Sequence, residues 1–230
     1  MAAKVKATAK DNGKSGANPT NRLPKAKEVV IGAPNLQVAE FLIEGNSPYV
    51  QCKFSAKVLS EMMATQEAGQ TAKKGKKREP KDFDALYLGA MHEADDGWRG
   101  IPATAFRQSM ISACRVCGFA MTRAKLSVFC VADGYDKDDR TAMVKITKGE
   151  PLRHLQYVRI ASGVADIRSQ AMWDAGWQAL VHIQFDGDQF TVDDVANLLM
   201  RAGMQVGIGC GRHDSTDSSG LGFGTFEILR

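Results

Sequence analysis

Hydrophobic and polar residues alternate along some stretches of the chain and recur at helical spacing along others. Successive side chains of a strand point to opposite faces, so alternation predicts strands, whereas apolar residues three or four positions apart predict helices. We expect strands at residues 36–45, 49–54, 126–132, 143–146, 156–160, 164–168, 177–185 and 225–229. We expect helices at residues 58–68, 83–92, 103–117 and 191–201.

The ends of two helices carry residues that favour helix termini. Pro102 stands at the predicted start of the helix over residues 103–117, and Gly118 follows its last residue. Thr191 and Asp194 are spaced as in a variant of the capping box. We expect Gly203 to end the helix that they begin.

The order of these elements predicts the fold class. A helix follows a strand twice, once after residues 49–54 and once after residues 177–185. Strand, helix, strand, then the same again, is the ferredoxin-like or RRM-like βαββαβ unit. We therefore expect an α+β fold with this core, in which the other strands and loops are insertions and a glycine-rich loop precedes the last strand.

The formal net charge of +4 hides two basic segments. Residues 1–27 hold seven basic residues and one acid, and residues 70–81 hold six basic residues and one acid. Both segments have almost no large apolar residues, so we expect a disordered basic arm at 1–27 and a single domain at 28–230, with a mobile basic insertion at about 69–82. Such segments favour a polyanion, most often nucleic acid, although solubilising tails have the same composition.

The glycine-rich loop is the strongest chemical feature. Glycine allows backbone N–H groups to approach a phosphate closely, and Arg212 and His213 add groups that could bind one. Neither Gly-Lys-Ser nor Gly-Lys-Thr follows the glycines of this loop, and the next element is a strand rather than a helix, so the loop is not a P-loop. A flexible hairpin loop is the alternative interpretation. The glycines are Gly207, Gly209, Gly211, Gly220, Gly222 and Gly224.

The sequence gives little support for metal binding or catalysis, and we expect neither a metal nor a cofactor. Cys114 and Cys117 form a CxxC pair, but no second pair supplies the four ligands that zinc requires, and both lie on the apolar stripe of a helix. We expect them to be small core residues. The acidic turn at 133–139 is expected to be solvated, and the four histidines belong to no recognisable triad motif. Only His213 and Asp136 remain as weak catalytic candidates.

Four aromatic residues lie in predicted strands: Tyr49, Phe54, Phe129 and Tyr157. Such side chains could stack on nucleic-acid bases. Most aromatic residues of strands pack inside a protein, so the sequence does not single out any of the four as a contact.

The sequence also bears on localisation. No apolar run approaches the roughly 20 residues of a membrane helix. The first residues lack the apolar core of a signal peptide. We therefore expect a cytoplasmic protein, with no membrane partner and with its five cysteines reduced.

Three segments, in chain order, carry a family resemblance: residues 43–48 (Ile-Glu-Gly-Asn-Ser-Pro), residues 100–110 (Gly-Ile-Pro-Ala-Thr-Ala-Phe-Arg-Gln-Ser-Met) and the glycine-rich loop at 207–224 with the strand after it. They resemble the RAMP superfamily, in particular the backbone subunits of CRISPR effector complexes that coat the guide RNA. Residues 164–168 also fit. The resemblance implies an RRM-like core, a basic groove for a single strand and side-by-side self-assembly. A stand-alone relative from a phage or another mobile element would share these segments.

We therefore predict a protein that binds single-stranded nucleic acid, RNA in the first place, by its backbone. It would form a homo-oligomer along the strand, with other ribonucleoprotein subunits as further partners. The alternatives are an enzyme, a RAMP-type endoribonuclease using His213 or Asp136, and a phage recombination protein that anneals single-stranded DNA. Besides the six glycines, the expected contacts are Lys73, Lys74, Lys76, Lys77, Arg78, Lys81, Arg107, Arg115, Arg168 and Arg212.

Overall fold

The computed structural model describes residues 31–54, 56–67, 80–159, 163–215 and 220–229. Residues 34–230 form one compact unit, to which the following description applies. The predicted arm at 1–27 lies outside the described residues, as do residues 73–78 of the basic insertion. In the described part of the chain, no helix combines the length and the apolar character needed to cross a membrane.

The larger sheet is antiparallel throughout and has seven strands in the described part of the chain. β1 (Leu36–Gly45) pairs with β9 (Gln178–Asp186) along almost its whole length, from Leu36 opposite Asp186 to Glu44 opposite Gln178. Two further strands lie off the main path, since β4 (Val128–Val131) pairs with β9 and β5 (Gly134–Tyr135) pairs with β6. The main path runs β10 (Phe226–Ile228), β1 (Leu36–Gly45), β9 (Gln178–Asp186), β6 (Ala142–Lys148) and β3 (Gly100–Pro102).

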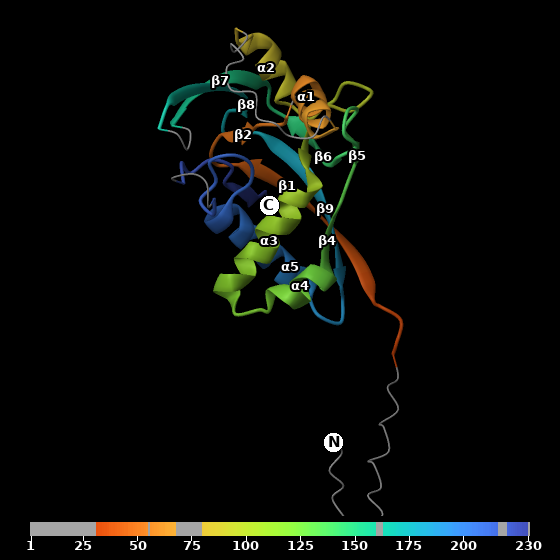
Figure 1. Cartoon of the computed structure of the whole chain (residues 1–230). Coiled ribbons are helices and arrows are strands. Elements are labelled where there is room, and N and C mark those ends of the chain that lie inside the picture. The colour runs from red at the N-terminus through yellow and green to blue at the C-terminus, as the bar shows by residue number, and fades with distance from the viewer. Residues whose placement is uncertain (1–30, 55, 68–79, 160–162, 216–219, 230) are drawn as a thin grey trace, which may run out of the picture. The chain divides into compact units, whose positions relative to one another are not determined.

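The smaller sheet has three strands in the order β2 (Tyr49–Gln51), β8 (Ala165–Trp173) and β7 (Pro151–Arg159). β7 and β8 pair along their full length. Helices α1 (Ala56–Glu67) and α2 (Phe83–Gly89) lie at this end of the molecule, at the top of Figure 1. The fold is therefore α+β, with antiparallel sheets and helices that follow the strands at intervals.

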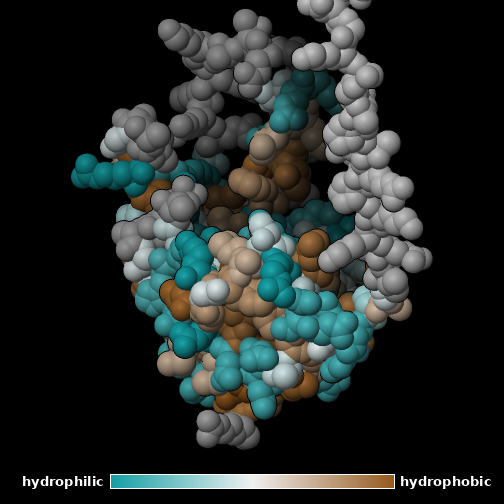
Figure 2. All heavy atoms as spheres, turned by 90° about the horizontal axis from the view of Figure 1, so that it is seen from below, coloured by the Kyte–Doolittle hydropathy of each residue, from teal (hydrophilic) through white to brown (hydrophobic). Residues whose placement is uncertain are grey.

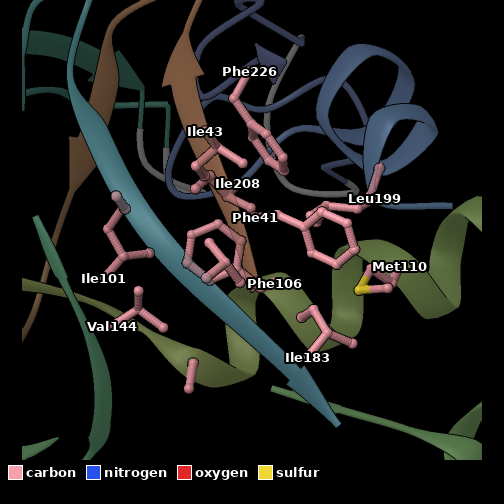
Figure 3. Packing of buried hydrophobic residues seen from close by; sticks show 14 of the residues in the cluster. Phe41, Ile43, Ile101, Phe106, Met110, Val144, Ile183, Leu199, Ile208 and Phe226 are labelled. Atoms are coloured by element: carbon pink, nitrogen blue, oxygen red, sulfur yellow. The ribbon is translucent and has the colours of Figure 1, made fainter. Parts of the chain in front are cut away.

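The core lies between the larger sheet and helices α3 (Ala103–Cys117) and α5 (Val192–Arg201). Figure 3 shows Phe41 and Ile43 of β1 pointing toward Phe106 of α3 and Leu199 of α5. Phe106 and Phe226 of β10 meet edge to face, with ring centroids 5.8 Å apart. Full burial of such side chains stabilises the fold by about 1.5–3 kcal/mol each.

Several predicted element ends are confirmed. α3 spans Ala103–Cys117, and Gly118 follows it in the left-handed conformation with φ of 69°. Both halves of the predicted capping box are present at α5, because the Thr191 side chain accepts from the Asp194 N–H and the Asp194 carboxylate accepts from the Thr191 N–H.

Several element predictions are wrong at their ends: α2 stops at Gly89 rather than at residue 92, and β7 and β8 are each nine residues long rather than five. Two further differences have a structural reason. Residues 126 and 127 belong to helix α4 (Met121–Ser127), and the strand begins only at Val128. Gly203 does not end α5, because the chain continues as a π-helical turn, η1 (Ala202–Val206), as far as Gly207. Gly203 serves packing instead, since a β-carbon there would lie 2.1 Å from the Phe226 carbonyl oxygen.

The helices also leave apolar side chains on the surface. Seen from below, the molecule shows hydrophobic residues separated by hydrophilic ones (Figure 2). Exposed apolar residues on the helices include Val116, Leu126, Val192 and Met204. Single exposed apolar residues are normal for a protein surface and indicate no site.

Candidate functional site

A cleft of about 1090 Å³ lies beside the smaller sheet. Its walls come from four parts of the chain: the segment from Cys52 to α2, the start of α3, the β7–β8 pair and the glycine-rich loop. In Figure 1 the glycine-rich loop, in dark blue, lies between α3 and the β7–β8 pair. Of the described residues in its walls, one is acidic, Asp214, and five are basic: Lys53, Lys81, Arg159, Arg168 and Arg212.

Three of the predicted basic residues line the cleft, and each comes from a different part of the chain: Arg168, Lys81 and Arg212. Arg168 is exposed on β8, opposite Gln156 of β7. Lys81 precedes α2, and its ammonium group lies 2.5 Å from the Asp166 carboxylate and donates to the Ile167 carbonyl oxygen at 3.0 Å. Arg212 donates to the Gly209 carbonyl oxygen at 3.1 Å, within its own loop.

The first three glycines of the loop, Gly207, Gly209 and Gly211, line the cleft, whereas Gly220, Gly222 and Gly224 do not. Two of the six are required by the loop's own packing. A β-carbon at Gly209 would lie 2.5 Å from the Val50 carbonyl oxygen, and one at Gly224 would lie 1.8 Å from the Ile208 carbonyl oxygen. Both positions also have positive φ, 74° and 70°, which glycine adopts without strain.

Backbone hydrogen bonds hold the loop against the rest of the chain. The Cys210 N–H donates to the Val50 carbonyl oxygen at 2.9 Å, and the Gly224 N–H donates to the Pro48 carbonyl oxygen at 2.7 Å. The Ile208 N–H donates to the Gly224 carbonyl oxygen at 3.0 Å. These three N–H groups are therefore already used and are not available to a phosphate.

Two predicted contact residues lie elsewhere. Arg107 donates to the carbonyl oxygens of Val128 at 3.1 Å and Lys125 at 2.5 Å, and its guanidinium group lies 5.2 Å from the centre of the Phe129 ring. Arg115 forms an ion pair with Asp214 at the edge of the cleft. Neither arginine lines the cleft itself, because both are engaged in joining α3 to its neighbours.

The cleft also contains a basic residue that the sequence did not single out. Arg159 and Tyr157 lie two positions apart on β7 and therefore on one face of it, and both line the cleft. Arg159 stands at the end of a strand and belongs to no motif, so only the structure brings it to the site.

Two of the four strand aromatics are exposed in the cleft. Tyr157 is 79% exposed, and Phe54, just after β2, is 63% exposed. Tyr49, in contrast, is buried in the core. Large aromatic side chains this exposed are unusual on a surface and can stack on nucleic-acid bases. Their exposure is the signal, and the sequence pattern alone could not separate them from strand aromatics that pack inside.

The expectation of a solvated acidic turn is wrong for Asp136, whereas Asp133, Asp138 and Asp139 are exposed as expected. Asp136 is fully buried, and its carboxylate lies 2.6 Å from the Lys53 ammonium group and 2.9 Å from Nδ1 of His92. It also accepts from the backbone N–H groups of Glu93, Asp138 and Asp139. Burial alone would raise the pKa of Asp136, but hydrogen bonds from Lys53, the turn backbone and His92 hold it well below its usual value of 3.8.

A buried ion pair lies within this cluster. His92, Asp136 and Asp139 place ligand atoms within 4.8 Å of one another, the grouping a metal ion would need. The Lys53 ammonium group, however, already provides the positive charge beside Asp136, and the same ammonium lies 2.8 Å from Asp138. His213, the other weak catalytic candidate, is not among the residues that line the cleft.

The CxxC pair divides between core and surface. Cys114 is buried in the core as predicted. The same prediction is wrong for Cys117, which is exposed at the last position of α3. The last turn of that helix reaches beyond the elements that cover Cys114.

Comparison of the chain with models of known protein families and with curated protein sequences finds no match.

Proposed function

We propose that this protein binds single-stranded nucleic acid along the cleft between the β7–β8 pair and the glycine-rich loop, with RNA as the preferred ligand. One observation carries the proposal: basic side chains from separate parts of the chain converge on one cleft. Five of the six charged residues described in its walls are basic. Two of the five, Lys53 and Lys81, already pair with the carboxylates of Asp136 and Asp166. The proposal therefore concerns the three arginines, Arg159, Arg168 and Arg212. Phosphate groups supply most of the affinity of such complexes, and Arg and Lys are the residues that bind them.

The residues divide the work between backbone and bases. Arg168 and Arg159 are exposed and free to turn toward phosphates, while Arg212 is held at its loop. Phe54 and Tyr157 offer exposed rings on which bases stack without regard to sequence. This combination favours a single strand, because the bases of a duplex are already stacked on each other.

The strand order supports the proposal that the core is ferredoxin-like and related to the RAMP superfamily. β10, β1, β9 and β4 are neighbours in that order, and each pair is antiparallel. Along the chain they follow the order β1, α3, β4, β9, α5, β10, which is a βαββαβ unit. In this assignment the first core helix is α3, not the helix after residues 49–54, and the segments between are insertions.

Titration against a labelled single strand of about 30 nucleotides tests the binding. Replacing Arg168 and Arg212 together by Ala should weaken binding about tenfold or more, because each charge-assisted phosphate contact contributes roughly 1.5–3 kcal/mol before solvent discounts it. The log–log salt slope should fall by about 1.4, or about 0.7 for each contact.

The matched control replaces Arg123 and Arg201, which lie on α4 and α5 outside the cleft, and changes the charge equally. If the cleft variant binds like the control and like the parent, the strand does not use the cleft. Discrete RNA products in the same reactions would favour the endoribonuclease alternative over binding alone. Faster pairing of complementary DNA strands would favour the annealing alternative.

We also propose that copies assemble side by side along the strand. The mass of the complex should then rise in steps as the strand is lengthened, at a constant number of nucleotides per copy. A single copy bound to every length, measured by light scattering, would contradict assembly while leaving the binding proposal intact.

A further inference from the structure

Two thiols meet in the wall of the cleft. Cys52 is exposed just after β2, and Cys210 is half-buried in the glycine-rich loop. The two segments are held together by the hydrogen bond from the Cys210 N–H to the Val50 carbonyl oxygen, 2.9 Å long. Cys52 and Cys210 both line the cleft, and their side chains interact there.

The surroundings of Cys52 favour its thiolate. The hydrogen bond from Cys210 lowers the pKa of Cys52 to about 6, with smaller contributions from Gln170 and Arg168, although burial acts in the opposite direction. The same pairing and burial raise the pKa of Cys210, against the charges of Arg212 and Arg168. These shifts favour a thiolate at Cys52 and a protonated thiol at Cys210.

The side chain of Gln170 is a second, independent sign that this place is built around the sulfur. Gln170 lies on β8, is only 2% exposed and lines the cleft. Its Oε1 has no hydrogen-bond partner in the described structure, and its side chain contributes to the lowered pKa of Cys52. A buried carbonyl oxygen without a partner is rare, and this one belongs to a residue in the wall that carries both thiols.

The other cysteines differ from Cys52. Burial raises the pKa of Cys130 to about 12 and also raises that of Cys114. Cys117 is exposed on α3, away from the cleft. It serves as a control thiol of comparable accessibility.

We propose that Cys52 and Cys210 form a redox-active pair, in which Cys52 reacts with hydrogen peroxide and Cys210 resolves the product as a disulfide. The Cys52 thiolate attacks one peroxide oxygen, the O–O bond breaks, and protonation of the leaving oxygen gives water and a sulfenic acid. The Cys210 sulfur then attacks the Cys52 sulfur, the S–O bond breaks, and the Cys210 proton leaves with the hydroxyl group as a second water. The two thiols lose two electrons in total, and the peroxide gains them.

This pair would regulate the cleft, an effect that rests on the proposed function. The reduced pair holds a negative charge beside Arg168, which competes with a phosphate for that guanidinium group. The disulfide is neutral and also ties the glycine-rich loop to the segment after β2. We therefore expect the oxidised protein to bind a single strand several-fold more tightly than the reduced protein at neutral pH.

The chemical step is tested on the full chain with hydrogen peroxide, followed by alkylation of the remaining thiols and peptide mapping. The expected product is one cross-linked pair of peptides joining Cys52 to Cys210, lighter by two hydrogen atoms than the reduced peptides together. In the Cys210→Ser variant, Cys52 should instead be trapped as a sulfenic acid by dimedone. Cys117→Ser should behave like the parent. Oxidation of Cys117 as fast as Cys52, or no Cys52–Cys210 cross-link, would overturn the proposal.

Strand binding by the reduced and oxidised parent separates the two proposals. If the cross-link forms but neither state binds a strand, the proposed function fails and the redox pair stands. If both states bind equally, the regulatory effect fails although the chemistry stands. Cys52→Ser carries no thiolate at this position, so its affinity should exceed that of the reduced parent and should not respond to peroxide.

Discussion

At the scale of single residues, the buried carboxylate of Asp136 is the least expected feature of the chain. Its partners Lys53 and His92 stand 83 and 44 positions earlier in the sequence, on other elements. An acidic run such as residues 133–139 gives no sign of which carboxylate meets a distant lysine. A buried ion pair therefore joins the segment after β2 to the turn after β5.

Removing one partner of this pair should be strongly destabilising. We expect Asp136→Asn to lower the free energy of unfolding by up to about 3–5 kcal/mol. The Lys53 charge, 3% exposed, would lose its buried partner and would keep only Asp138, whose side chain is 39% exposed. Urea unfolding followed by circular dichroism measures this loss. The control is Asp95→Asn, which breaks an ion pair with Arg140 whose side chains are each 70% exposed. That change should cost no more than about 1 kcal/mol, and equal losses in the two variants would refute the distinction.

The same carboxylate predicts a pH dependence. Its pKa is lower in the folded state than its ordinary value of 3.8, so the unfolded chain binds the proton more readily. The stabilisation is then fully present above about pH 4 to 5 and is lost progressively as the pH falls below the ordinary value. Unfolding of the parent and of Asp136→Asn, measured from pH 7 down to about pH 3, should converge as the pH falls. A constant difference between the two curves would contradict this account.

At the scale of elements, the glycine-rich loop depends on its glycines for two separable reasons, backbone conformation and space. Gly97, which lies outside this loop, has φ of 85° and open space around it. Gly224, within the loop, has φ of 70°, and the Ile208 carbonyl oxygen lies where its β-carbon would be. The two positions therefore form a matched pair for substitution by alanine.

We expect Gly97→Ala to cost about 1–2 kcal/mol of stability, the cost of a left-handed conformation for an L-residue. Gly224→Ala should cost about 3 kcal/mol or more, because the collision adds to the same backbone cost. Thermal unfolding of both variants gives the comparison. Equal shifts in Tm would mean that the chain around Ile208 can move away from residue 224 without loss of stability.

How far the elements could be predicted follows from where their signals lie. The C-terminal end of α3 depends on Gly118, and the start of α5 depends on Thr191 and Asp194. These residues act within one helical turn, and both predictions are confirmed. The π-helical turn after α5 could not be predicted, because Gly203 is a helix breaker in sequence but a close neighbour of β10 in space.

The cleft was predictable only in part for the same reason. Arg168 and Arg212 belong to segments that the sequence marks out, and both line the cleft. The exposure of Phe54 and Tyr157 depends instead on the packing of distant segments, which no local pattern encodes.

At the scale of the whole molecule, the basic insertion should add to the affinity of the cleft for a strand. Five of its residues lie outside the described part of the chain, so their contribution remains a prediction: Lys73, Lys74, Lys76, Lys77 and Arg78. Changing all five to Ala should weaken binding and lower the log–log salt slope by about 0.7 for each phosphate that is no longer neutralised. Titrations at several salt concentrations measure the slope.

The control for that variant removes five basic residues that do not line the cleft: Arg123, Lys125, Lys145, Lys148 and Arg201. It changes the net charge equally. If both variants show the same fall in affinity and in slope, the effect is one of overall charge and the insertion does not touch the strand. If neither changes, the insertion is a solvated spacer.

The pairing of β1 has a consequence for how the chain folds as it is made. β1 ends at Gly45, and its two neighbours in the sheet, β9 and β10, begin only at Gln178 and Phe226. At a synthesis rate of about 5–20 residues per second, β1 waits on the order of ten seconds for its first partner. During that interval Phe41 and Ile43 have no core to enter, and both edges of the strand are open to other chains. We therefore expect a nascent chain of this protein to bind chaperones that hold extended apolar segments, and its yield should depend on their supply when synthesis is slow.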